Sequence, residues 1–166
     1  MPAKIIIVDK KDNPIGVKER GTLDNNKDIY RVSALLITNS KGQFLLARRA
    51  FSKKQNPGKW GPAVSGTIEE GETYDYNIIK EAEEELGLNN IKPIKWIKNN
   101  TLKYNYKHYT QWYKLNLDKP LSYFKPNERE VAEIKWFDKE ELLKAIEENS
   151  DEVIDSLKEF INLINS

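Results

Sequence analysis

The chain has 166 residues, with 27 lysines and arginines against 26 acidic residues, and a net charge of +1. This near-neutral balance predicts no strong attraction to nucleic acid or to a membrane surface. Because the chain has no cysteine and only one histidine, His108, it excludes disulfides, thiolate metal sites, cysteine nucleophiles and multi-histidine metal sites. We expect a single domain over residues 1–166, with no secretory leader and no membrane-spanning segment, and therefore a cytoplasmic protein.

Short apolar, β-branched runs predict that the first part of the chain is mainly strands. Turn-forming residues separate these runs at 9–14 and 39–42. The expected strands are Lys4–Val8, Ile15–Arg20, Tyr30–Thr38, Gln43–Arg49 and a short one at Pro62–Gly66. The polar stretch at 21–28 predicts an exposed connection.

Residues 73–87 have the pattern of a capped helix with one acidic arc. Thr73 is a suitable N-cap and Gly87 a suitable left-handed C-terminal residue. At about 100° per residue, an apolar stripe contains Ile78, Ile79, Ala82 and Leu86, while Glu81, Glu84 and Glu85 share a separate arc and Glu83 points elsewhere. Like charges at this spacing repel, so the arc is explained either by solvent or by a divalent cation. Carboxylate oxygens suit Mg²⁺ or Mn²⁺ better than zinc.

The second part of the chain predicts further strands followed by two helices. We expect strands at Ile91–Ile97, within Leu102–Leu117 and at Val131–Phe137, then helices at Glu140–Glu148, with Asp138 as N-cap, and Asp151–Ile164. Tyr104 and Tyr106 alternate and would share a strand face. Sheet packing explains most of the aromatic residues near them, although a base or sugar pocket stays open as the other interpretation. We expect His108 to be structural or exposed.

Residues 66–88 resemble the signature box of the Nudix hydrolases. The matching positions are Gly66, Glu72, Glu81, Glu84, Glu85, Gly87 and the aliphatic residues Ala82 and Leu88, and the one departure is Lys80, where the family has arginine. The resemblance implies an α/β fold of the Nudix type, an α/β/α sandwich around a mixed β-sheet, here with an N-terminal β-hairpin. It also implies divalent-metal-dependent hydrolysis of a diphosphate in a nucleoside diphosphate linked to another group (NDP-X) or in a similar organic diphosphate.

The resemblance also assigns roles to residues of the box. Glu81, Glu84 and Glu85 would bind Mg²⁺ or Mn²⁺ with a backbone group of Gly66, and these glutamates with Lys80 form the catalytic set. Glu72 would orient the loop or add an outer contact. In the family, an acidic residue before the late strand often adds a ligand or a base, and Glu128 and Glu130 are the candidates here.

Basic residues gather just before the box. Arg48, Arg49 and Lys59 lie near one another in the sequence. Together with Arg31, they are the candidates for binding an anionic substrate. For each residue alone, a solvated surface charge is the competing interpretation. Arg48 and Arg49 have the stronger claim because they end a predicted strand.

The same region resembles the branch of the superfamily that contains isopentenyl diphosphate isomerase. By that resemblance Ser65 stands at the position of the catalytic cysteine, and Thr67 and Tyr30 stand at positions of ligand histidines. The isomerase chemistry therefore lacks its residues, and a hydrolase acting on a small-molecule diphosphate is the main prediction. The alternatives are a degenerate domain that binds nucleotide without hydrolysis and, with less support, the isomerase itself. We expect no membrane partner and no specific nucleic acid, and a homodimer stays open.

Overall fold

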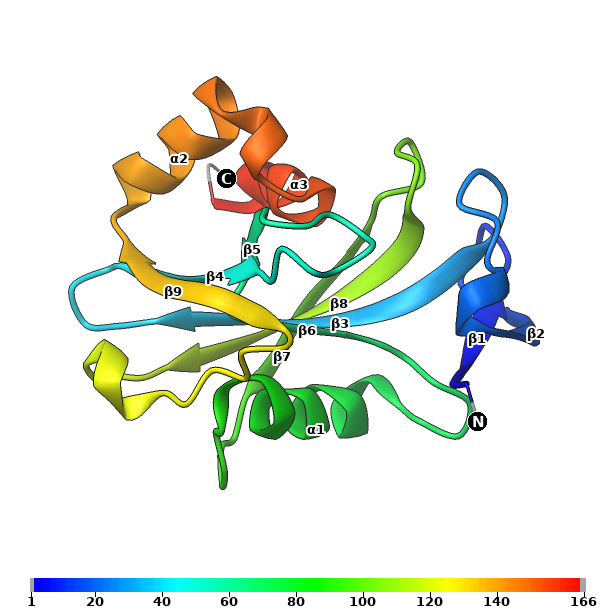
Figure 1. The fold of residues 1–166 in the computed structure, drawn as a ribbon, viewed down its shortest axis with the longest axis horizontal. Helices are drawn as coiled ribbons and strands as arrows, with labels where there is room; N and C mark the ends of the chain where they lie inside the picture. Colours follow the sequence, from blue (N-terminus) through cyan, green and yellow to red (C-terminus); the bar gives the residue numbers. More distant parts are fainter. Residues whose placement is uncertain (1, 165–166) are drawn as a thin grey trace.

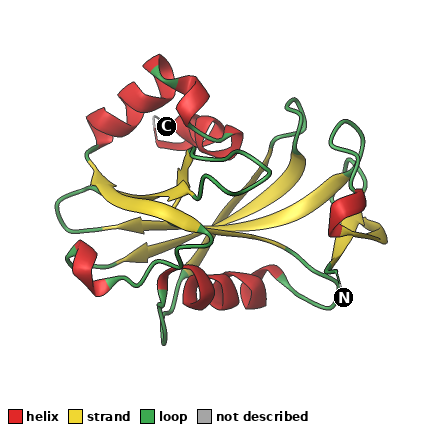
Figure 2. Cartoon of the chain, viewed as in Figure 1, coloured by secondary structure: helices red, strands yellow, loops and turns green. Residues whose placement is uncertain are grey.

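The computed structural model describes residues 2–164, and one mixed sheet of nine strands dominates it (Figure 1). The helix α1 (Tyr74–Leu86) covers one face, and α2 (Lys139–Glu148) and α3 (Asp155–Ile164) cover the other (Figure 2). The strands are β1 (Lys4–Val8), β2 (Pro14–Glu19), β3 (Ile29–Thr38), β4 (Phe44–Arg49), β5 (Trp60–Pro62), β6 (Val64–Thr67), β7 (Ile94–Asn100), β8 (Lys107–Asn116) and β9 (Val131–Phe137). The predicted fold class, with β1 and β2 as an antiparallel N-terminal hairpin, is confirmed.

The strand β3 is the central strand of the sheet. Along one edge it pairs in parallel with β8 over ten residues, from Ile29 to Thr38. Its other edge is divided among β1, β6 and β4, and β4 pairs with it only at residues 37 and 38. Beyond this point β4 leaves β3 and pairs with β5 and β9 instead. The sheet therefore opens into two parts, which diverge in Figure 1.

Alternating side chains of β3 pack into two separate hydrophobic cores, one on each face of the strand. Leu35 and Ile37 pack with the buried side of α1, whereas Ala34 and Leu36 belong to the cluster that contains Phe160 of α3. Burying both faces of a strand requires a continuous apolar run, which is the pattern that the sequence of β3 shows. The position of α1 relative to β3 is thereby fixed by packing.

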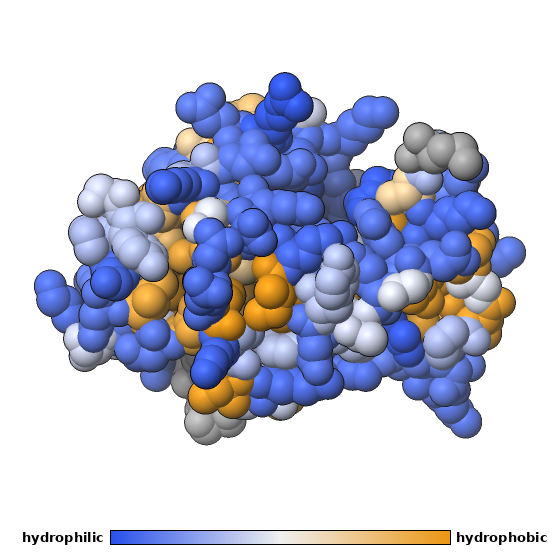
Figure 3. All heavy atoms as spheres, turned by 90° about the horizontal axis from the view of Figure 1, so that it is seen from below, coloured by the Kyte–Doolittle hydropathy of each residue, from blue (hydrophilic) through white to orange (hydrophobic). Residues whose placement is uncertain are grey.

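The predicted helix caps are confirmed. The Thr73 side chain accepts a hydrogen bond from the Tyr76 N–H at 3.1 Å, and Gly87 adopts φ = 66°. A capping box joins Asp138 and Glu141 at the start of α2. The predicted apolar stripe of α1 was wrong at Ile79, which is 42% exposed. The α1 side of the molecule is mostly hydrophilic, with smaller apolar patches between the hydrophilic residues (Figure 3).

Three predicted elements have different bounds. The strand expected at 91–97 is β7, which begins at Ile94, after Pro93. Tyr104 and Tyr106 do not share a strand face, because they lie in the turn before β8, which Thr101 closes by bonding the Tyr106 carbonyl. The last helix begins at Asp155 and not at Asp151, because Val153 is held in a bridge with Trp60.

The predicted strand Pro62–Gly66 is in fact two strands, β5 and β6, which pair with different partners. In the part of the chain that the structure describes, no helix is both long and apolar enough to span a membrane.

Candidate functional site

A cleft of about 690 Å³ opens where the two parts of the sheet diverge. Its walls come from β3, β4, β6, α1, the loop after β4, the loop before β9 and the start of α3. The strand β6 pairs with β3, and it brings Ser65 and Gly66 to the edge of the cleft. The cleft therefore gathers residues from most of the chain around one end of α1.

Gly66 lets α1 approach β6 closely. A Cβ atom at this position would lie 2.3 Å from Cγ of Glu81 and 2.8 Å from Oδ1 of Asn77. Any side chain there would push Glu81 away from the cleft. The glycine that begins the box is thus required by packing, whatever its backbone binds.

The structure brings the three predicted box carboxylates into the same cleft. Glu81, Glu84 and Glu85 line it with Glu130, which comes from the loop before β9, while Glu83 is exposed elsewhere. Burial, opposed by the charge of Lys80 and supported by that of Glu84, raises the pKa of Glu81 to about 7. Burial likewise raises the pKa of Glu85, with Glu81 and Glu130 adding to the effect. Glu84 and Glu130 act on Glu81, and Glu81 and Glu130 act on Glu85, so these carboxylates favour a proton or a cation among them.

The donor chemistry of these residues fits a hard divalent cation. Within residues 2–164 no three carboxylate or imidazole groups are already arranged around one point as ligands. Binding would therefore require the side chains to draw together, which their shared cleft allows. Glu128, the other predicted acidic residue, does not line the cleft, whereas Glu130 does.

Lys80 holds the loop between β6 and α1 through Glu72. Its Nζ lies 2.5 Å from Oε2 of Glu72 and 3.8 Å from carboxylate oxygens of Glu69 and Glu81. Oε1 of Glu72 accepts the Glu69 N–H at 2.8 Å. Burial opposes ionisation of Glu72, but the hydrogen bond from Lys80 lowers its pKa overall. The lysine thus makes one short contact, to Glu72, and cannot form the forked pair of bonds that an arginine could offer.

Asn77 is a residue of this site that the sequence analysis missed. It is 0% exposed; its Oδ1 accepts the Ser33 hydroxyl at 2.5 Å, and its Nδ2 donates to Glu72 at 3.0 Å and to the Thr67 carbonyl at 3.2 Å. These bonds tie α1 to β3 and to the loop, one turn before Glu81. The sequence did hold a signal for this residue: a polar amide side chain directly before Ile78, on the side of the helix that faces the sheet.

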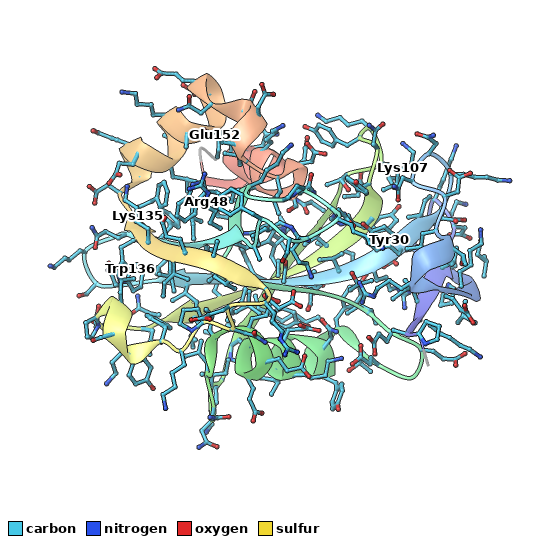
Figure 4. All side chains as sticks on the ribbon, in the orientation of Figure 1. Tyr30, Arg48, Lys107, Lys135, Trp136 and Glu152 are labelled. Carbon is cyan, nitrogen blue, oxygen red and sulfur yellow. The ribbon has the colours of Figure 1, made fainter. Side chains whose placement is uncertain are left out.

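The predicted basic residues separate into two groups. Arg49 and Arg48 line the cleft, and their Nε atoms each donate at 2.9 Å to carbonyls of the loop after β4, those of Gln55 and Gly58. Arg48 lies on the side of the sheet that α2 and α3 cover, with its guanidinium 5.0 Å from the Phe51 ring centroid (Figure 4). Burial lowers the pKa of Arg49, and the charges of Glu85 and Glu130 oppose this shift.

The other two basic residues lie outside the cleft lining. Arg31 donates from Nε to Oδ1 of Asp12 and from Nη2 to the Asp12 carbonyl, both at 2.7 Å. These bonds pin the β1–β2 turn to the sheet. Lys59 is also absent from the residues that line the cleft.

Comparisons with known proteins place this geometry in context. The NUDIX domain pattern matches residues 28–157. An uncharacterised Nudix hydrolase of Pseudomonas aeruginosa is 38% identical over 81 residues, covering 49% of this chain and 48% of that protein, so the match spans about half of the relative's length. An isopentenyl-diphosphate Delta-isomerase of Klebsiella pneumoniae is 29% identical over 153 residues, covering 86% of this chain and 79% of the isomerase.

A solved structure of a Deinococcus radiodurans protein resembles the fold of the whole chain. The TM-score is 0.82, with 23% identity, over 96% of this chain and 97% of that one. At this identity the likeness supports the fold alone.

Proposed function

Since this chain belongs to the Nudix hydrolase family, we propose that it hydrolyses the diphosphate bond of a nucleoside diphosphate linked to another group, NDP-X. The observation that supports this most is the convergence of Glu81, Glu84, Glu85 and Glu130 in one cleft with Arg49. Carboxylates alone would repel a diphosphate. The arrangement makes chemical sense only if positive charge lies between them and the substrate.

Glu81, Glu84 and Glu85 would hold Mg²⁺ or Mn²⁺, with a backbone group of Gly66 beside them and Glu130 as a further candidate ligand. When bound, the metal would neutralise charge on the diphosphate oxygens and make a water more acidic. Arg49 uses Nε for the Gln55 carbonyl, which leaves its terminal nitrogens to bind phosphate oxygens.

Glu81 is the best candidate for accepting a proton from water. In the metal-free protein its pKa is about 7, and a carboxylate with this pKa is basic enough to take a proton at neutral pH. A metal bound directly by Glu81 would lower this pKa, and Glu81 would then be a third ligand and not the base. Lys80 stays in the catalytic set as a positioning residue, since it holds Glu72 and lies 3.8 Å from Glu81.

The test is a phosphate-release assay on a panel of NDP-X compounds, with Mg²⁺, with Mn²⁺ and with excess chelator. We expect metal-dependent release that the chelator abolishes. Full activity in chelator would contradict the proposal. Metal-dependent binding without release would support the degenerate, non-hydrolysing domain, which the replacement of the box arginine by Lys80 keeps as the second candidate.

A further inference from the structure

An ion pair joins the two loops beside the cleft carboxylates. Nζ of Lys53, in the loop after β4, lies 2.6 Å from Oε2 of Glu130, in the loop before β9, and both residues line the cleft. Among residues 2–164, no other lysine or arginine side chain is hydrogen-bonded to one of the four cleft carboxylates, and Lys80 stays 3.8 Å from Glu81. An ammonium of the protein therefore already supplies positive charge to Glu130.

Backbone hydrogen bonds hold both residues in place without this ion pair. They lie just beyond the end of the ladder between β4 and β9, which run side by side in Figure 1. The Ala50 N–H donates to the Glu130 carbonyl at 3.0 Å, and the Lys53 N–H donates to the Ala50 carbonyl at 3.1 Å. The Glu130 N–H donates to the Asn127 carbonyl at 2.9 Å, and the Asn127 N–H donates to the Glu85 carbonyl at 2.8 Å. The two side chains can therefore separate while both loops keep their positions.

The ion pair is weak enough for a divalent cation to replace it. The side chains of Lys53 and Glu130 are 30% and 43% exposed, and a pair that water reaches contributes little free energy. Glu130 also acts electrostatically on Glu81 and on Glu85. A doubly charged ion among these carboxylates would attract Glu130 more strongly than one ammonium does.

We propose that Lys53 is the counter-ion of Glu130 in the metal-free protein, and that Glu130 exchanges Lys53 for Mg²⁺ or Mn²⁺ when the metal binds. Lys53 is thus a positioning residue that lowers the affinity of the cleft for metal, because the ion pair must break first. The inference rests on the proposed function and adds how metal binding at the same site is controlled.

Calorimetric titration with Mn²⁺, in the absence of substrate, tests this exchange. Lys53→Met removes the competing ammonium, and we expect Mn²⁺ to bind about fivefold more tightly, the scale of a partly exposed ion pair. Lys54→Met is the matched control, because Lys54 is exposed, lies outside the cleft lining and forms no ion pair with a described residue. It removes the same charge and should change the affinity less than about twofold.

A double-mutant cycle with Glu130→Gln separates the ion pair from long-range repulsion of the metal. In the Glu130→Gln protein, Lys53→Met should change the affinity less than about twofold, since no carboxylate is left to compete for. Lys53→Arg can keep the ion pair and should bind Mn²⁺ like the unchanged protein. Thermal melts check folding, and Lys53→Gln takes the place of Lys53→Met if that variant folds poorly.

Three results would overturn the exchange and leave the proposed function intact. These are an unchanged affinity of Lys53→Met, a weaker affinity of Lys53→Met, and an equal gain with and without the Glu130 carboxylate. Absence of Mn²⁺ binding to the unchanged protein would instead overturn the proposed metal site together with this inference.

Discussion

At the scale of single residues, the four glutamates of α1 should differ sharply. Glu81, Glu84 and Glu85 line the cleft, and Glu83 does not. Changing Glu84 or Glu85 to Gln keeps the shape and removes a charged ligand, and we expect the hydrolysis rate to fall at least about a hundredfold. Folding should survive, because relieving repulsion does not open the core.

Glu83→Gln is the control in the same helix, and its rate and melting temperature should stay near those of the unchanged protein. The measurement is the hydrolysis rate of the four single Glu→Gln variants side by side, with thermal melts with and without Mg²⁺. If all four variants behave alike, the acidic arc is only a solvated surface.

Glu81 should also make stability depend on pH. Its folded pKa is about 7 against an ordinary 4.5, so between these values the folded protein holds a proton that the unfolded chain has released. The free energy of unfolding therefore falls as pH rises through 7, by on the order of 1–3 kcal/mol. In EDTA the melting temperature should be higher at pH 5.5 than at pH 8, and Glu81→Gln should shrink the difference.

A second experiment measures the melting temperature at pH 8 after Mg²⁺ is added. A cation replaces the missing proton among the carboxylates, so it should raise the melting temperature of the unchanged protein more than that of Glu81→Gln. An identical pH dependence in the two proteins would show that the Glu81 carboxyl is not responsible.

At the scale of elements, we expect the hydrogen bonds of Asn77 to hold α1 in position against the sheet. Asn77→Ala leaves the buried Ser33 hydroxyl without its acceptor and removes two bonds to the loop. We expect a loss of about 2–4 kcal/mol in the free energy of unfolding, measured by chemical denaturation. Tyr76→Ala, on the exposed side of the same helix, should cost less than about 0.5 kcal/mol. Similar losses in both variants would contradict this role.

Local signals in the sequence were sufficient for the ends of α1 and α2, because a cap is formed by residues three or four positions apart. The strands from β1 to β4 followed from β-branched runs. The start of α3 did not, because Val153 is held by Trp60, a partner distant in the sequence. The ion pair of Arg31 with Asp12 also joins residues that are distant in the sequence. Periodicity alone therefore cannot show that Arg49 lines a cleft whereas Arg31 holds a turn in place.

The functional site likewise has features that local sequence predicts and features that depend on contacts between distant residues. The spacing of the box placed Glu81, Glu84 and Glu85 on one face because helical geometry is regular. The role of Asn77 and the contact between the Tyr30 and His108 rings depend on which strands become neighbours. Only the parallel register of β3 and β8 sets those two rings side by side.

At the scale of the whole molecule, the likeness to one isopentenyl-diphosphate Delta-isomerase covers 86% of this chain, but most side chains differ at 29% identity, so isomerase activity has to be judged at the positions that its chemistry needs. Ser65 stands at the position that the resemblance gives to a catalytic cysteine, and a serine hydroxyl does not ionise as a thiol does. The same resemblance gives Thr67 and Tyr30 the positions of ligand histidines, and the Tyr30 hydroxyl accepts a hydrogen bond from Gln55.

We therefore expect no interconversion of isopentenyl and dimethylallyl diphosphates. Proton NMR of each compound incubated with the protein and Mg²⁺ would measure it, with an NDP-X substrate hydrolysed in the same preparation as the control for active protein. Interconversion at an enzyme-like rate would mean that the cleft moves protons on an alkene without a thiol.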